Sequence, residues 1–301
     1  MNKKMIFRGT GTALFTPFTH RNTLDEKSLR SLVEYQIKNG VEALIPTGTT
    51  GESPTLTKEE HARVVEIVAE QNRGRKKIIA GTGSNSKMQT IALSQHVSEY
   101  KVDGLLLVGP YYNKPTQEGF FLHFSEIAFN TSLPIILYNI PGRTVSNMTA
   151  ETVLRLAEEI PQIVGIKEAS GNIEQVMEIL RNRPKNFAVY AGDDAMALPF
   201  IALGGDGVIS VIANEAPKLF SDLVHHCFEG NFTKALRIHN QLLPLMNFNF
   251  IESNPIPVKA ALAIMKKIED VIRLPLIPLS KKHRITMEKI LRGLSLIKNN
   301  S

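Results

Sequence analysis

Residues 163–169 read Ile163-Val164-Gly165-Ile166-Lys167-Glu168-Ala169, and this stretch shows the pattern that decides the fold. It is short, largely apolar and rich in β-branched residues, as expected for a strand of a parallel sheet that is covered on both faces. Similar runs recur along the chain, separated by amphipathic segments. The expected strands are residues 11–17, 43–47, 77–81, 104–108, 135–139, 164–168, 188–191 and 207–211.

Strands that alternate with helical segments in this way indicate a closed (β/α)₈ barrel, the TIM-barrel class of α/β fold. The competing architecture is an open, doubly wound sheet. That fold wants a glycine-rich phosphate-binding turn after its first strand. Residues 10–17 read Thr10-Gly11-Thr12-Ala13-Leu14-Phe15-Thr16-Pro17 instead. The barrel is therefore the favoured fold.

Helix signals between the strands agree with this pattern. The segment 24–39 has an apolar stripe at helical spacing and ends at Gly40. Residues 57–60, Thr-Lys-Glu-Glu, form a capping box that opens the next helix, and residues 147–151 provide a similar start. From Phe232 onward only helical patterns remain. We therefore expect a catalytic barrel over residues 1–229 and a helical C-terminal region over residues 230–301.

Composition excludes several classes of protein. The chain of 301 residues is 43% hydrophobic and 21% charged, which is ordinary for a soluble globular protein. No run approaches the roughly 20 apolar residues that span a bilayer, and residues 1–6 lack the apolar stretch and cleavage site of a secretory signal. The single Cys227 rules out an intramolecular disulfide and a multi-cysteine metal site, and it fits a cytoplasmic location.

The net charge of +6 is spread along the chain. Its short basic clusters, residues 73–77 and 281–284, are not interleaved with aromatic residues. Such clusters are typical of a solvated surface, so we expect neither a nucleic-acid nor a membrane partner. A mildly positive field favours small anionic substrates.

Lys167 is the most informative residue of the chain. Burial in an apolar run lowers the pKa of an amine and makes its neutral, nucleophilic form accessible, which is how lysines are prepared for Schiff-base chemistry with carbonyl substrates. The alternative is a lysine at a strand end whose stem packs while its ammonium reaches water. The segment alone leaves both interpretations open.

The ends of the other expected strands carry unusual polar residues, and in a barrel these ends form the active-site rim. A Gly-Thr-Thr-Gly turn at residues 48–51 follows the second strand, and a proline-bracketed Tyr-Tyr pair at 111–112 follows the fourth. Tyr138 ends the fifth strand and Arg143 follows it, offering a phenol for proton transfer and a fork for a carboxylate. Asp193 and Asp194 follow the seventh strand, where they either cap the next helix or take part in catalysis. Together with Lys167, these groups point to carbonyl chemistry on a carboxylate-bearing substrate.

These motifs resemble the dihydrodipicolinate synthase (4-hydroxy-tetrahydrodipicolinate synthase) family, within the pyruvate-dependent superfamily that also contains N-acetylneuraminate lyase. The resemblance runs from Gly11 to about Arg284. The matching stretches are residues 48–52, 111–115, 138–144, 165–169, 204–211 and 254–259.

The resemblance implies a role for individual residues. Lys167 is expected to form an imine with pyruvate. Tyr138, Thr49 and Tyr112 are expected to relay protons, with Tyr112 reaching into a neighbouring subunit. Thr50 and the backbone of Ile209 match pyruvate-binding positions. Arg143 matches the residue that holds the carboxylate of aspartate semialdehyde.

The implied activity is a lyase of the class I aldolase type that condenses pyruvate with L-aspartate 4-semialdehyde, the entry step of lysine and diaminopimelate biosynthesis. The resemblance implies no metal and no organic cofactor, because the lysine imine is the electron sink. It also implies a homotetramer built as a dimer of dimers.

Two rival functions stay open from the sequence. A related aldolase acting on sugar acids or sialic acid keeps Lys167, Tyr138 and the Gly-Thr turn, although Arg143 and the paired threonines and tyrosines favour the synthase. A barrel that binds small anions or nucleic acid without catalysis is the other rival, and failure to trap a pyruvate imine would favour it.

Lysine-sensitive members of the family have an effector site at the dimer interface. Four positions here match that pattern, Ser53, His61, Asn85 and Tyr111. Two positions depart from it, because Lys58 replaces a histidine and Gln89 replaces a glutamate. A lost carboxylate and an added cation both disfavour a cationic ligand, so we expect weak or absent inhibition by lysine.

Overall fold

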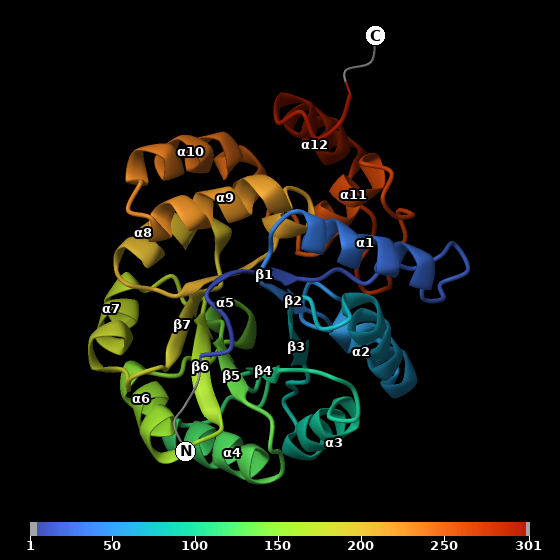
Figure 1. Cartoon of the computed structure of the whole chain (residues 1–301). Coiled ribbons are helices and arrows are strands. Elements are labelled where there is room, and N and C mark those ends of the chain that lie inside the picture. Colours follow the sequence, from blue (N-terminus) through green and yellow to red (C-terminus); the bar gives the residue numbers. More distant parts are fainter. Residues whose placement is uncertain (1–4, 299–301) are drawn as a thin grey trace.

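The computed structural model describes residues 5–298, and within them eight parallel strands close into one barrel in chain order (Figure 1). The strands are β1 (Gly9–Ala13), β2 (Ala43–Ile45), β3 (Lys77–Gly81), β4 (Gly104–Val108), β5 (Ile135–Asn139), β6 (Ile163–Glu168), β7 (Ala188–Ala191) and β8 (Gly207–Ser210). Pairing of β1 with β8 completes the ring. The predicted (β/α)₈ barrel is confirmed.

Helices surround the barrel on its outside (Figure 1). They are α1 (Glu26–Lys38), α2 (Lys58–Asn72), α3 (Lys87–Val97), α4 (Gln117–Phe129), α6 (Ala150–Glu159), α7 (Ile173–Asn182), α8 (Ala197–Ala202) and α9 (Pro217–Phe228). A four-residue helix, α5 (Pro141–Thr144), follows β5, and 3₁₀ turns occupy Ser53–Thr55, Asp194–Met196 and Ile212–Asn214. The predicted capping box is present, since Thr57 and Glu60 each accept a hydrogen bond from the other's backbone amide at the start of α2. None of the helices described here is both long enough and apolar enough to cross a bilayer.

Apolar side chains fill the interior of the barrel. Phe7 and Tyr190 stack there with ring centroids 4.4 Å apart, and the buried Tyr190 phenol donates to the carbonyl of Phe7. At the closing seam, Gly207 has φ +146°, and a Cβ there would clash with the backbone of Gly9. A filled interior leaves the rim at the carboxyl ends of the strands as the place for a site.

Three strands, β2, β6 and β8, differ from the predicted ranges by one or two residues at one end, and β1 differs by more. It runs from Gly9 to Ala13, two residues earlier at its start than predicted, and stops before Leu14. Beyond that point the Asn214 side chain provides hydrogen bonds to the backbone. It accepts from the Phe15 amide and donates to the Ala13 carbonyl. The apolar residues after Ala13 are therefore buried in a loop.

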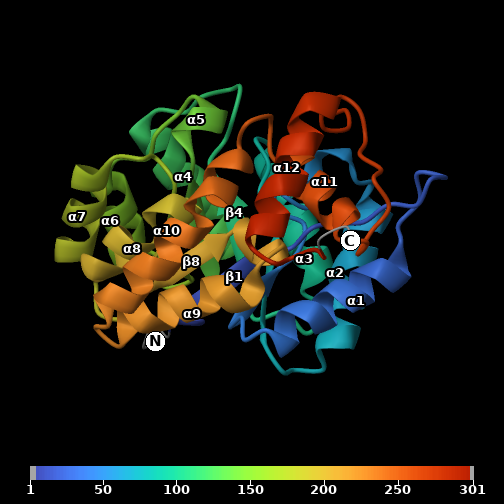
Figure 2. The same ribbon diagram turned by 90° about the horizontal axis from the view of Figure 1, so that it is seen from above.

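The C-terminal region consists of α10 (Phe232–Phe248), α11 (Ile256–Ile264) and α12 (Lys281–Gly293). In Figure 2, α10 lies along α9, while α11 and α12 lie together on the side of α1. Apolar residues of α10 and α12, including Leu245 and Met287, belong to the same core as the helices of the barrel. The expected division at 229/230 falls in the turn between α9 and α10, and it stays a prediction.

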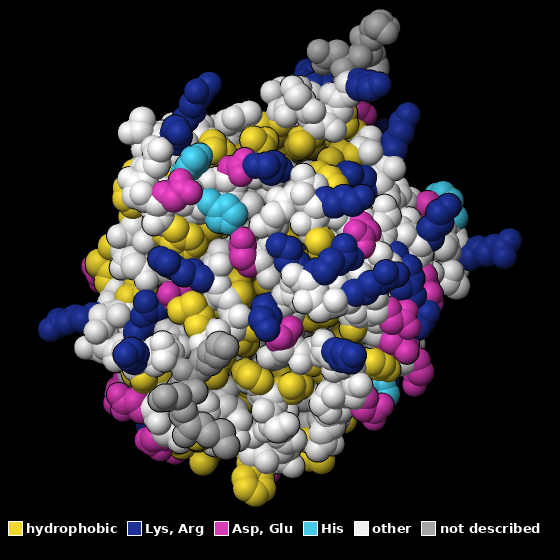
Figure 3. Space-filling model, viewed as in Figure 1, with side chains coloured by type: hydrophobic (Ala, Val, Ile, Leu, Met, Phe, Trp, Pro, Cys, Tyr) yellow, Lys and Arg dark blue, Asp and Glu magenta, His cyan; other side chains and the backbone are white. Residues whose placement is uncertain are grey.

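On the face of the molecule seen in Figure 3, Lys and Arg side chains are interspersed with Asp and Glu. Opposite charges also pair in the structure, as in Arg30 with Glu70 and Lys77 with Asp103. The basic residues of this face therefore do not gather into one continuous surface. Residues 1–4, part of the stretch examined for a secretory signal, lie outside the described residues.

Candidate active site

Lys167 and Tyr138 lie side by side at the carboxyl ends of β6 and β5. The strand register pairs these two residues directly, and the Lys167 Nζ lies 4.2 Å from the centroid of the Tyr138 ring. Both side chains are buried, with exposed fractions of 5% and 6%. Within residues 5–298, Lys167 has no carboxylate within ion-pair distance. The interpretation of Lys167 as a snorkelling lysine is therefore wrong, because its amine stays inside.

Burial gives this amine the electrostatics of a nucleophile. Desolvation lowers the pKa of Lys167 to about 8, and the nearby Arg143 cation acts in the same direction. The Asp194 carboxylate opposes this shift. A lysine with such a pKa supplies a substantial neutral fraction near neutral pH, which is the form that attacks a carbonyl carbon.

Thr49 joins the pair from the loop after β2. Desolvation raises the pKa of Tyr138 to about 12, and the Arg143 cation and the Thr49 side chain partly offset this shift. Thr47 turns the chain into the loop with φ 55°, and its hydroxyl donates to the carbonyls of Pro46 and Gly81. A protonated phenol beside a hydroxyl can donate a proton to a reacting group and later take one back.

A cavity of about 350 Å³ opens onto this group. Thr49, Tyr138 and Arg143 line it, while the buried Lys167, Thr50 and Ile209 lie outside its lining. Arg143, in α5 directly after β5, is exposed and donates to the backbone carbonyl of Asn254 at 3.2 Å. The structure therefore places an exposed cation on the wall of the cavity, while the Lys167 amine is buried next to Tyr138.

Tyr111 and Tyr112 occupy the loop after β4 but point to different places. Tyr111 lines the cavity. Tyr112 has φ 70° and is 91% exposed, so it takes no part in the cavity of its own chain. The structure thus brings two of the three expected relay residues together, and the third projects outward.

The two aspartates after β7 have different environments. Asp193 caps the 3₁₀ turn Asp194–Met196 by accepting from the Ala195 amide at 2.9 Å. Asp194 is buried and accepts from the backbone amides of Val211 and Ile212 beyond β8. Desolvation raises the pKa of Asp194 to about 6. Capping, the first of the two predicted roles, thus describes Asp193, while Asp194 lies close enough to Lys167 to influence its charge.

Comparison with known proteins adds a decisive observation. The model of the dihydrodipicolinate synthetase family matches residues 6–294. The chain belongs to this family. It is 50% identical over 289 residues to the 4-hydroxy-tetrahydrodipicolinate synthase of Chloroherpeton thalassium, an alignment that covers 96% of each chain.

Solved structures of the family agree with this assignment. The dihydrodipicolinate synthase of Thermotoga maritima is 43% identical, with a TM-score of 0.95 over 97% of this chain and 100% of that one. A chloride-inhibited dihydrodipicolinate synthase from Acinetobacter baumannii, complexed with pyruvate, is 42% identical, with a TM-score of 0.94 over 97% of this chain and 100% of that one. These relatives are synthases, so the predicted lyase of lysine and diaminopimelate biosynthesis is confirmed over the sugar-acid alternative.

Most of the positions compared with the family's effector site border the cavity. Ser53, Lys58, His61, Gln89 and Tyr111 line it, and the imidazole of His61 bonds to the carbonyl of Gly81 at 2.8 Å. Asn85 lies outside the lining and accepts through its carbonyl from Asn113. Burial lowers the pKa of His61, which favours its neutral form.

A buried ion pair that sequence reasoning missed fastens the loop containing Thr49 and Thr50. Lys259, on α11, pairs with Glu52, and each side chain is only 1% exposed. The Lys259 Nζ also lies 4.4 Å and 4.6 Å from the ring centroids of Phe15 and Phe18. The sequence signal was available, because Lys259 stands in an apolar run just as Lys167 does.

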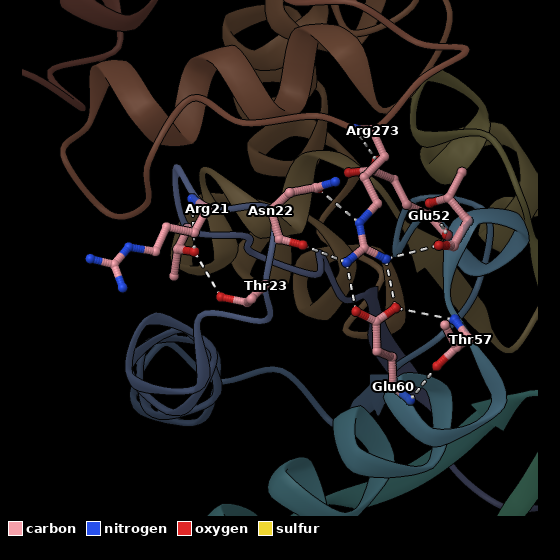
Figure 4. A network of polar contacts seen from close by, with 9 residues as sticks. Arg21, Asn22, Thr23, Glu52, Thr57, Glu60 and Arg273 are labelled. Carbon is pink, nitrogen blue, oxygen red and sulfur yellow. Dashed lines mark hydrogen bonds and ion pairs between the residues drawn. The ribbon is translucent and has the colours of Figure 1, made fainter.

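Arg273 continues this attachment on the same loop. Figure 4 shows its guanidinium facing the carboxylate of Glu60, which it binds at 2.6 Å through both terminal nitrogens. It also donates to the carbonyls of Thr55 and Asn22, and its backbone amide donates to Glu52. The C-terminal region therefore holds the active-site loop at several points. Within residues 5–298, no group of three or more His, Cys, Asp or Glu side chains is arranged to bind a metal ion.

Proposed function

We propose that this member of the family condenses pyruvate with L-aspartate 4-semialdehyde to 4-hydroxy-tetrahydrodipicolinate through an imine on Lys167. The observation that supports this most strongly is a buried amine that has no ion-pair partner in the described part of the chain and lies 4.2 Å from the ring of a buried tyrosine. The pyruvate complex of the Acinetobacter baumannii relative supports pyruvate as the first substrate.

In the first step, the neutral Nζ of Lys167 attacks the keto carbon of pyruvate. The resulting carbinolamine loses its hydroxyl as water, and the C=N bond of the imine forms. The Tyr138 phenol, next to the Lys167 amine, is placed to deliver the proton that this leaving hydroxyl needs. A phenol whose pKa is raised to about 12 keeps its proton until a stronger base develops beside it.

In the second step, the imine acts as an electron sink, and the former pyruvate methyl group loses a proton to give an enamine. The enamine carbon attacks the aldehyde carbon of the second substrate, and the new alkoxide takes a proton. The amino group of that substrate then attacks the imine carbon and displaces the Lys167 amine as the ring closes. Overall, one water leaves and no electron is gained or lost, so neither a metal nor an organic cofactor is needed.

Substrate binding is assigned by charge. The hydroxyl of Thr50 and the backbone of Ile209 hold the carboxylate of pyruvate, and the exposed Arg143 receives the carboxylate of the semialdehyde. The exposure of Arg143 on the cavity wall supports this division, because Thr50 and Ile209 are buried whereas Arg143 stays open to a second substrate.

Tyr112 completes the relay in a neighbouring subunit. A tyrosine that is 91% exposed and held at φ 70° has no packing role in its own chain, which supports its use by a partner. We propose a homotetramer, a dimer of dimers, located in the cytoplasm. Light scattering tests the assembly, and a fully active monomer would contradict it.

Trapping of the imine tests the proposed function. Incubation with pyruvate followed by borohydride should add one irreversible adduct, mapped by mass spectrometry to Lys167 and absent from Lys167→Ala. Lys259 is an internal control, because its pKa is also lowered to about 8 by burial while its amine is engaged by Glu52. An adduct that persists in Lys167→Ala, or one mapped to Lys259, would refute the assignment.

A further inference from the structure

Among the described residues of the C-terminal region, only Asn254 bonds to both Thr50 and Arg143. Its side-chain Nδ2 donates to the Thr50 Oγ1 at 3.1 Å. Its backbone carbonyl accepts from the Arg143 guanidinium at 3.2 Å. Asn254 and Thr50 are 5% and 2% exposed, so water does not compete for their bond.

The position of Asn254 is fixed by the helix that follows it. It directly precedes Pro255 and α11, whose Lys259 is paired with Glu52 in the buried interior. Glu52 lies two residues after Thr50, so the two bonding partners of this segment belong to the same short loop. The separation between Asn254 and Thr50 is therefore held by the single ion pair between Lys259 and Glu52, which joins the two chain segments.

The direction of the hydrogen bond decides what Thr50 can do. An amide nitrogen donates and cannot accept, so the Thr50 oxygen is the acceptor in this bond. Within residues 5–298 the Thr50 hydroxyl hydrogen has no acceptor of its own, and it is free to donate to an anion. A hydroxyl that accepts one hydrogen bond also becomes a stronger donor in the next.

Stability does not explain the asparagine. Its Oδ1 is buried without a hydrogen-bond partner within residues 5–298. Leaving such an atom unsatisfied is unfavourable for folding. The presence of an asparagine here is better explained by the hydrogen bond that its Nδ2 donates to the Thr50 hydroxyl.

We propose that Asn254 is a positioning residue that commits the Thr50 hydroxyl to donating a hydrogen bond to the carboxylate of pyruvate. Its backbone carbonyl at the same time orients Arg143 for the second substrate. This inference rests on the proposed function, because it assumes that pyruvate binds at Thr50.

The test compares Asn254→Ala, Asn254→Asp and the neighbouring, exposed Ser253→Ala as the matched control. Asn254→Ala removes the donor but keeps the backbone carbonyl. The KM for pyruvate should rise about 5- to 10-fold, the scale of one hydrogen bond, while the KM for the semialdehyde changes less than about 2-fold. Ser253→Ala should match the wild type.

Asn254→Asp keeps the shape of the side chain and reverses the hydrogen bond. The Thr50 hydroxyl would then donate to the new carboxylate, which also repels the pyruvate carboxylate. The KM for pyruvate should rise on the order of 10²-fold, more than in Asn254→Ala, because like charges face each other. This nearly isosteric variant also provides the test if Asn254→Ala does not fold, and a thermal melt monitors folding in both.

A double-mutant cycle with Thr50→Val completes the test. If Asn254 acts through the Thr50 hydroxyl, Asn254→Ala should add little to the loss already caused by Thr50→Val. Fully additive losses, or an unchanged pyruvate KM in both Asn254 variants, would overturn the positioning role. Failure of the wild type to form a borohydride-stable pyruvate adduct would instead overturn the proposed function itself, so the two failures are distinguishable.

Discussion

The pH dependence of imine formation should report the burial of Lys167 directly. With the pKa of this amine lowered to about 8 from an ordinary 10.5, about 9% is neutral at pH 7, against about 0.03% for an ordinary lysine. Only the neutral form attacks the keto group. The rate of adduct formation should therefore increase about 90-fold between pH 6 and pH 9 and level off above about pH 8.5.

Timed pulses of limiting pyruvate, quenched with excess borohydride and followed by intact-mass spectrometry, measure this rate. Tyr138 does not interfere, because its pKa is about 12. Asp194→Asn is an informative companion variant. It removes a negative charge that raises the pKa of Lys167, so the break in the profile should move to lower pH. A rate that still rises tenfold per pH unit above pH 9 would show that Lys167 is an ordinary lysine and that the desolvation argument is wrong.

Further predictions concern catalysis, stability and regulation. Tyr138→Phe should fold normally and lose about 10²-fold in turnover, and near-normal turnover would refute its relay role. Arg143→Lys should raise the KM for the semialdehyde well above any change for pyruvate, because an ammonium does not reproduce a bidentate fork, whereas equal effects would contradict this division. Lys259→Met should lower the free energy of unfolding in urea by about 3–5 kcal/mol by leaving the Glu52 carboxylate buried and unpaired, and adding Glu52→Gln should restore most of it. Lysine should inhibit weakly or not at all, Gln89→Glu should strengthen inhibition, and strong submillimolar inhibition of the wild type would refute the expectation.

The repeating pattern of short apolar runs predicted the barrel correctly, because a strand that is covered on both faces must be apolar along most of its length. Strand ends were less predictable. Residues 14–17 are as apolar as a strand, yet the amide of Phe15 bonds to the Asn214 side chain instead of to a neighbouring strand. Periodicity reports burial, and a buried loop next to the barrel gives the same signal as a strand.

The candidate site shows the same limit more sharply. Lys167 and Lys259 are both lone lysines in apolar runs, and burial lowers the pKa of each to about 8. Only the structure separates them, because Lys259 is paired with Glu52 and Lys167 has no such partner within residues 5–298. The contact of Asn254 with Thr50 was equally hidden, since 204 positions separate the two residues and no local pattern reports such a distance.

The attachment of the active-site loop by Asn254, Lys259 and Arg273 has a consequence for how the enzyme is made. All barrel strands are complete by Ser210, but the groups that fix the loop at Thr50 and Glu52 are among the last to be synthesised. Since the chain is made from the N-terminus, the lysine and tyrosine of the site are synthesised well before the residues that anchor the substrate-binding loop. Catalytic competence therefore arrives late in translation, and chains that terminate before about residue 250 should be inactive, because they lack all three attachments of the loop.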